Sequence, residues 1–318
     1  MLGLGVLLCN SLGAGLYWRT VAAVPVVLCL LNFCCLLAVP ESPLWLLGHR
    51  GPHQARLALR WLRQSEDVEA EIKQIQNIME DQSRGLTMTQ ALRNLSRPHV
   101  RTPFLLVTVN YFLVIISGPP IIMFYSVSIF QNIGQTIDKY VVAILSASVQ
   151  VIGGIVGMFL VQRLPRVKLN MMSMSVMSVS MAALGTAIYL KEAQPIYSTV
   201  LDSVQLVAVV LYMFCFGAGS GPLIFVLMGE LLPREYKVLS GIATALSNLP
   251  LFAITKAFPS LQQAMAPGAP FWLLAGVCAL SNIFYFFFLP ETRGKTALEV
   301  KQIFSKQKVK PDPVIQSK

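Results

Sequence analysis

Amide side chains are rare inside the long apolar runs of this 318-residue chain, so each is a candidate for binding chemistry. A buried amide without a hydrogen-bond partner costs about 1–3 kcal/mol, so it either bonds a neighbouring helix or faces a polar cavity. An amide that faces a cavity can exchange hydrogen bonds with the hydroxyl groups of a solute. The candidate amides in the apolar runs are Asn10, Asn32, Asn110, Gln150, Asn248 and Asn282.

The residue types that enzymes use are not arranged for catalysis. All six cysteines lie inside apolar runs, and none has metal-ligand spacing with a histidine. The three histidines fall between residues 49 and 99 without a partner pattern. We therefore expect no enzyme activity, no metal and no cofactor. The only acidic residues in the apolar runs after residue 101 are Asp138, Asp202 and Glu230 near their ends, so no proton relay is visible.

The apolar runs are long enough to cross a bilayer, which needs about 20 residues per helix. Hydrophobic residues make up 55% of the chain, and the mean hydropathy is +0.62. The composition predicts an all-α integral membrane protein with a partial span at 1–17 and seven full spans. These lie near 20–39, 102–130, 138–162, 169–190, 202–230, 237–258 and 269–289. The spans at 102–130 and 202–230 are long and contain Gly/Pro breaks, which favours helices that are discontinuous at a binding site.

The excess of basic residues predicts the orientation in the membrane. If the loop after the second run faces the cytoplasm, 21 of the 25 Lys and Arg residues lie on that side. The other side holds Arg19, Lys139, Lys191 and Lys256. This split follows the positive-inside rule, so the +10 charge indicates topology rather than a nucleic-acid partner. We expect the central loop and the C-terminus to be cytoplasmic.

The loop between residues 48 and 101 is the one sizeable polar region. Apolar residues at helical spacing in 55–63 and 68–75 predict short amphipathic helices. They would lie against the membrane face or against the inner mouth of the helical bundle. Basic and acidic residues alternate there without an aromatic platform, which makes the loop a poor nucleic-acid site.

Two related motifs stand where apolar runs give way to charged residues. One reads Pro-Glu-Ser-Pro-Leu-Trp-Leu-Leu at 40–47, and the other reads Pro-Glu-Thr-Arg-Gly-Lys-Thr at 290–296. They resemble the PESPRWL and PETKG motifs that end the sixth and twelfth helices in the sugar porter family of the major facilitator superfamily. Residues 217–233 resemble the family's GPGPIPW…GEIFP segment, and the ending Gly-Glu-Leu-Leu-Pro leans toward insect trehalose transporter-like members.

The resemblance implies a fold and a division of the chain. It implies a major facilitator superfamily bundle, represented by the C-terminal six-helix half together with helix 6 and part of helix 5. The expected segments are a remnant of the N-terminal bundle at 1–39 and a cytoplasmic helical loop at 40–101. The six-helix bundle follows at 102–289, and a cytoplasmic tail at 290–318.

The resemblance also implies which residues bind and move. Gln150 and Asn248 fall where family members place amides that face the sugar, and Phe225 takes the place of the family's tryptophan lid. For either amide, a hydrogen bond between helices is the alternative. The gating hinge would comprise Gly118, Pro119, Pro120, Gly219, Gly221 and Pro222. The cytoplasmic charge network would comprise Glu41, Arg163, Arg166, Glu230, Lys237, Glu291 and Arg293.

The span at 102–130 departs from the family pattern. Val114, Ile115 and Pro120 stand where family members have two glutamines and an asparagine that contact the sugar. Losing even two hydrogen bonds at about 1 kcal/mol each weakens binding more than tenfold. We therefore do not expect high-affinity glucose recognition.

Two functional hypotheses follow. The first is a hexose or trehalose transporter of the plasma membrane that works by alternating-access facilitated diffusion, represented by a partial chain that does not transport alone. The second is a non-transporting partner that associates with a full-length transporter, or with the missing N-terminal half, and regulates it. A seven-helix receptor fits the span count but not the two Pro-Glu motifs or the basic loop. In either hypothesis the partners are a sugar and the lipid bilayer, with no nucleic acid.

Overall fold

Bilayer-length apolar helices make up most of the structure, as the apolar runs predict. The computed structural model describes residues 2–83, 90, 93–130, 139–193, 198–232, 237–295, 299 and 304. Within these residues, seven helical segments are long and apolar enough to cross a membrane, and a shorter apolar helix precedes them. No strand occurs in the described part of the chain, so the all-helical prediction is confirmed.

The helices divide into two compact units. The first unit is the helical bundle. Its elements are α1 (Leu2–Gly15), α7 (Pro98–Ile116), α8 (Pro119–Phe130), α9 (Lys139–Arg163), α10 (Arg166–Ala193), α11 (Ser198–Cys215), η2 (Phe216–Ser220), α12 (Gly221–Leu231), α13 (Lys237–Ala264) and α14 (Ala269–Phe288). The second unit holds α2 (Trp18–Ala38), α3 (Pro43–His49), α4 (Pro52–Arg63) and α5 (Glu69–Ser83).

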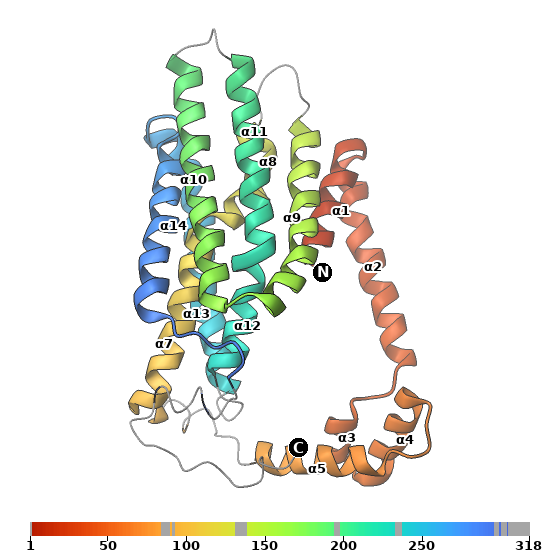
Figure 1. Cartoon of the computed structure of the whole chain (residues 1–318). Coiled ribbons are helices and arrows are strands. Elements are labelled where there is room, and N and C mark those ends of the chain that lie inside the picture. The colour runs from red at the N-terminus through yellow and green to blue at the C-terminus, as the bar shows by residue number, and fades with distance from the viewer. Residues whose placement is uncertain are drawn as a thin grey trace. The chain divides into compact units, whose positions relative to one another are not determined.

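The bundle is organised around α9 and α10. Helix α10 packs against α14 and α11, while α9 packs against α1, α11 and η2. Helices α14, α10, α11, α9 and α1 run side by side in Figure 1. Helix α7 packs against α13, α12 and α14. Met174, Met177 and Met181 of α10 are fully buried, which fits the i, i+3, i+7 spacing of a face that points into the core.

Two helices of the bundle are discontinuous. The span read at 102–130 forms α7 and α8, which are separated at Ser117 and Gly118. The span read at 202–230 forms α11 and α12, joined by the π-helical segment η2. Proline explains the first break, because it has no backbone N–H and clashes with the preceding turn. A π-helical turn inside an α-helix often marks a functional site.

The second unit combines one membrane-length helix with a small amphipathic cluster. Helix α2 spans 21 residues, and four residues separate its end at Ala38 from the start of α3. Helices α3, α4 and α5 pack together around a small apolar core that contains Leu46, Leu59 and Ile72. Arg63 forms an ion pair of 2.7 Å with Glu71, and hydrogen bonding to Arg63 lowers the pKa of the Glu71 carboxyl.

Candidate functional site

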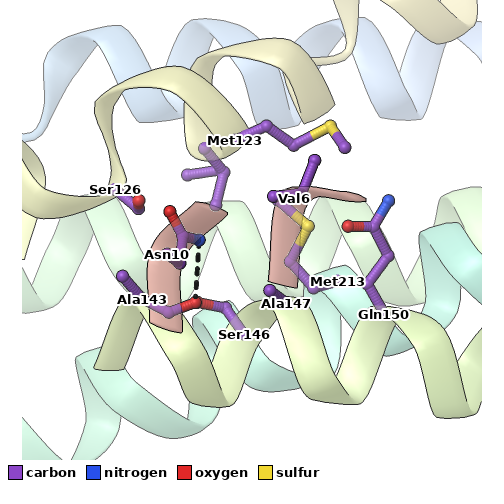
Figure 2. A pocket seen from close by; sticks show the side chains of 10 residues that line it. Val6, Asn10, Met123, Ser126, Ala143, Ser146, Ala147, Gln150 and Met213 are labelled. Carbon is purple, nitrogen blue, oxygen red and sulfur yellow. Dashed lines mark hydrogen bonds between the residues drawn. The ribbon is translucent and has the colours of Figure 1, made fainter. Parts of the chain in front are cut away.

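A small cavity lies between α1, α8, α9 and α11, and Gln150 lines it. Its volume is about 10 Å³, which is room for about one water molecule. Figure 2 shows Gln150 toward one end of the cavity and Asn10 with Ser126 toward the other. The lining residues are Val6, Asn10, Ile122, Met123, Ser126, Ala143, Ser146, Ala147, Gln150 and Met213.

Among the described residues, some polar side chains that line this cavity have a hydrogen-bond partner and that of Gln150 does not. Asn10 donates from Nδ2 to the Ala143 carbonyl at 3.4 Å, and the Ser146 hydroxyl donates to the Val142 carbonyl at 2.6 Å. Gln150 is 8% exposed, and no described residue bonds its side-chain amide. An almost buried amide without a protein partner is suited to hydrogen-bond a water or a solute hydroxyl.

Asn248 and Phe225 do not line this cavity. Asn248 lies on an exposed part of α13, where its Nδ2 donates to the Thr244 carbonyl one turn earlier at 3.0 Å. Phe225 of α12 is 61% exposed, and its ring meets Tyr111 of α7 edge to face at 6.4 Å between centroids. The structure therefore does not bring the three predicted substrate-binding residues into one cavity.

The break at Gly118 is held by side chains of two other helices. Gly118 has φ +113°, a backbone conformation that glycine adopts easily and other residues adopt rarely. Pro119 and Pro120 are the first two residues of α8. The Ser117 carbonyl lies at the break, and the Tyr212 hydroxyl of α11 donates to it at 3.0 Å. The Cys278 thiol of α14 also approaches that carbonyl at 3.8 Å. The predicted hinge residues thus form a helix break beside the cavity, because Ile122, Met123 and Ser126 of α8 line the cavity wall. Whether this break moves stays a prediction.

The other predicted hinge glycines lie in tight helix contacts. A Cβ added at Gly219 would meet the Ser173 Cβ at 2.5 Å, and one at Gly221 would meet the Phe216 carbonyl oxygen at 2.8 Å. The Ser173 hydroxyl donates to the Cys215 carbonyl at 2.7 Å, where the π-helical turn begins. Pro222 is the second residue of α12, directly after the π-helical segment. Whether this segment moves stays a prediction.

Five members of the predicted charge network meet at one end of the bundle, and one ion pair joins two of them among the described residues. Arg166 Nη2 lies 3.0 Å from Glu230 Oε1, and the Thr292 hydroxyl donates to Glu230 Oε2 at 2.5 Å. Arg293 donates from its guanidinium to the Arg163 carbonyl. The side chain of Lys237 lies outside the described residues. Glu41 belongs to the second unit, where its carboxylate accepts from the Ser42 backbone N–H at 3.1 Å.

Glu291 caps the start of α10. Its Oε1 accepts from the Arg166 backbone N–H at 2.9 Å, and its Oε2 accepts from the Val167 backbone N–H at 3.1 Å. The first N–H groups of a helix have no partner within the helix, and a carboxylate satisfies them and complements the helix dipole. The second Pro-Glu motif therefore fastens the chain after α14 to the start of α10.

We expect Glu291→Ala to destabilise the bundle by about 0.5–2 kcal/mol, the usual effect of losing an N-terminal cap. Glu291→Gln keeps one acceptor oxygen and should lose less. Thermal melting of the purified protein in detergent measures both. Glu192→Ala, which removes an exposed carboxylate from the other end of α10, is the control. Equal melting temperatures for the Glu291 and Glu192 variants would contradict the capping role.

Two polar contacts between helices, one buried and one partly buried, were not foreseen from the sequence. Asn170 of α10 donates from Nδ2 to Asn110 Oδ1 of α7 at 3.2 Å, with both residues buried. Lys191 of α10 pairs with Asp202 of α11 at 2.6 Å. Asn170 could have been noticed as a further amide within an apolar run, but its partner lies 60 residues away.

Comparison with known proteins places these features in a family. The family model described as "Sugar (and other) transporter" matches residues 1–304. The facilitated trehalose transporter Tret1 of Apis mellifera ligustica is 29% identical over 95% of this chain and 60% of its own length. Tret1 of Drosophila erecta is 32% identical over 94% of this chain and 35% of its own length. The chain thus spans between about a third and three fifths of the length of these two relatives.

Solved structures agree on the fold. The xylose transporter XylE from E. coli, in a partially occluded inward-open conformation, matches with a TM-score of 0.72 and 20% identity. The match covers 92% of this chain and 61% of XylE. At 20% identity, the likeness concerns the fold alone. This fold is the one of the major facilitator superfamily. On the family match and this fold, the chain is an integral membrane protein that belongs to the sugar transporter family.

Proposed function

We propose that this chain is part of a transmembrane sugar transporter that works by alternating-access facilitated diffusion, with a hexose or trehalose as the solute. The observation that carries the proposal is the helix break at Gly118 beside a cavity lined by an amide that no described residue bonds. Transporter binding sites form where discontinuous helices meet near the middle of the membrane. The family match supports a sugar as the solute, and both insect relatives are named for trehalose.

In this proposal the cavity beside Gln150, which has room for about one water molecule here, widens during alternating access so that Gln150 binds the sugar directly. Asn248 and Phe225 contribute from the exposed faces of α13 and α12. An amide on the surface of a membrane helix is stable where it contacts water, a solute or another protein, but not where it contacts lipid tails. Exposure of Asn248 therefore supports a position facing an aqueous cavity or a second bundle. Phe225, also exposed, would close over the sugar as an aromatic lid.

The charge network would form the cytoplasmic end of the transport path. Arg166, Glu230 and Glu291 are its centre, and Arg163, Arg293, Lys237 and Glu41 are its proposed outer members. The bias of 21 basic residues to one side supports the cytoplasmic assignment. We also propose the plasma membrane as the location and keep the segment boundaries at 1–39, 40–101, 102–289 and 290–318.

Uptake of radiolabelled trehalose and glucose tests the proposal. Alternating access needs two bundles that rock around one site. The assay therefore has two arms in yeast that lack hexose transporters: this chain alone, and this chain fused behind the N-terminal bundle of the Apis relative. We expect uptake in the second arm. No uptake of either sugar by a fusion that reaches the membrane would contradict the proposal.

Gln150→Ala in the fusion is expected to raise the half-saturation concentration about 2- to 10-fold, which corresponds to one hydrogen bond of about 0.5–1.5 kcal/mol. Ser148→Ala is the matched control, because the Ser148 hydroxyl donates to the Ile144 carbonyl within α9 at 2.8 Å. An unchanged half-saturation concentration in Gln150→Ala would remove this residue from the sugar site.

A second function, a non-transporting partner of a full-length transporter, is favoured by one observation. Val114 of α7 is fully buried, and it stands with Ile115 where family members have sugar-binding glutamines. The bundle thus lacks two hydrogen-bonding groups of a sugar site. Co-expression with the Apis transporter distinguishes the two functions, because a regulatory partner alters uptake by that transporter, whereas a chain without such a role leaves it unchanged.

A further inference from the structure

Helix α4 has two apolar faces, and the described residues of its unit cover one of them. Ala55, Ala58 and Leu59 are buried in the core formed with α3 and α5. On the opposite side, Leu57 and Trp61 lie one turn apart and are 54% and 56% exposed. Positions i and i+4 are neighbours on a helix surface, so these two side chains form a continuous apolar strip.

Basic groups flank this strip. His53 precedes Leu57 by four residues, and Arg60 follows it by three, so both lie on the same side of the helix as the strip. Helix α4 contains no acidic residue. Arg56 and Arg63 pair with Glu69 and Glu71 of α5, whereas Arg60 makes no ion pair with a described residue. We call His53, Leu57, Arg60 and Trp61 the outer face of α4.

The chain keeps this face close to the bilayer. Four residues join the end of α2 to the start of α3, and an extended chain of that length reaches at most about 14 Å. Helix α4 packs on α3, and packed helices lie about 8–10 Å apart. A surface that combines Trp and Leu with Arg, tethered this near a membrane helix, has the composition of helices that lie in the headgroup layer.

We propose that the outer face of α4 docks on the anionic phospholipid surface of the bilayer that α2 spans. Trp61 and Leu57 enter the boundary between headgroups and acyl chains, and Arg60 lies beside the lipid phosphates. Trp is enriched at this depth because its ring is apolar while its indole N–H can bond polar groups. The negative potential of the cytoplasmic leaflet attracts Arg60 in the same orientation. This proposal does not depend on which solute the bundle carries.

The test is depth-dependent quenching of Trp61 in the full chain, reconstituted into phosphatidylcholine vesicles with and without phosphatidylserine. Subtracting the emission of Trp61→Phe isolates this residue from Trp18, Trp45 and Trp272. We expect lipids brominated near the headgroup to quench the difference signal, and more strongly when phosphatidylserine is present. Because α2 keeps the chain in the bilayer, the signal reports docking of α4 rather than binding of the whole protein.

Arg60→Gln should lower the ratio of docked to undocked α4 about fivefold in the vesicles with phosphatidylserine, the usual effect of one basic residue near an anionic surface. Lys73→Gln, which removes the same charge from an exposed position on α5, should have little effect. Quenching by aqueous acrylamide without quenching by brominated lipid would mean that this face is solvated. Resistance to both quenchers would mean that protein covers it, and either result overturns the proposal.

Discussion

Gly153→Ala should lower the thermal stability of the bundle, whereas Gly154→Ala, one residue along the same helix, should not. A Cβ added at Gly153 would stand 2.5 Å from the Phe214 carbonyl oxygen and 3.2 Å from the Ala218 backbone nitrogen. These are backbone atoms of a neighbouring helix, so they cannot turn aside as a side chain could. At Gly154 an added Cβ meets nothing within 4 Å.

The two substitutions change the same chemical group in the same helix, so their difference isolates the helix contact. Overpacking of a close contact usually costs about 1–3 kcal/mol. Alanine favours a helix over glycine by up to about 1 kcal/mol, so Gly154→Ala should be neutral or stabilising. Melting of the purified variants in detergent, followed by size-exclusion chromatography, measures both. Equal melting temperatures would show that α9 and α11 can separate without loss.

The same contact can be tested from its other side. A Cβ added at Gly217 of η2 would stand 2.5 Å from the Gln150 carbonyl oxygen, so Gly217→Ala should destabilise the bundle as Gly153→Ala does. Small residues let membrane helices approach closely and pack without a hydrophobic driving force. Because the contact includes the backbone of Gln150, the approach of η2 to α9 also fixes where the Gln150 amide stands in the cavity.

The membrane-spanning helices were predictable because bilayer thickness sets the length of an apolar run. The run at 138–162 is α9, which begins at Lys139 and ends at Arg163, where charged residues meet the membrane surface. The break in 102–130 was predictable from adjacent prolines. The π-helical turn was not, because the Cys215 carbonyl at its start is bonded by Ser173, which lies 42 residues earlier in the chain.

The site was harder to predict than the helices. A membrane helix can be apolar on all sides, so its sequence does not reveal which side faces the core, the cavity or the lipid. Gln150 and Asn248 looked equivalent as isolated amides, yet one lines a cavity and the other bonds its own helix on an exposed surface. The family resemblance predicted that Arg166 and Glu230 share one end of the bundle, but not that the Glu291 carboxylate bonds backbone N–H groups instead of an arginine side chain.

Arg166→Gln and Glu230→Gln should each lower the stability of the bundle by about 1.5–3 kcal/mol, the usual range for a hydrogen bond to a charged group. The Arg166 side chain is 13% exposed and that of Glu230 is 29% exposed, so water replaces the lost partner poorly. In Arg166→Gln, the Thr292 hydroxyl remains as a neutral donor to Glu230. Thermal melting in detergent measures each loss.

The double variant decides whether the two side chains act as a pair. Removing either charge leaves the other partly buried without its partner, so the combined substitution should cost less than the sum of the two single substitutions. Lys168→Gln is the control. Lys168 follows Arg166 by two residues on α10, its side chain is exposed, and it makes no ion pair with a described residue. It should change stability by no more than about 0.5 kcal/mol. If the Arg166 and Glu230 losses simply add, the ion pair does not join α10 to α12, and each side chain stabilises the bundle through its other contacts.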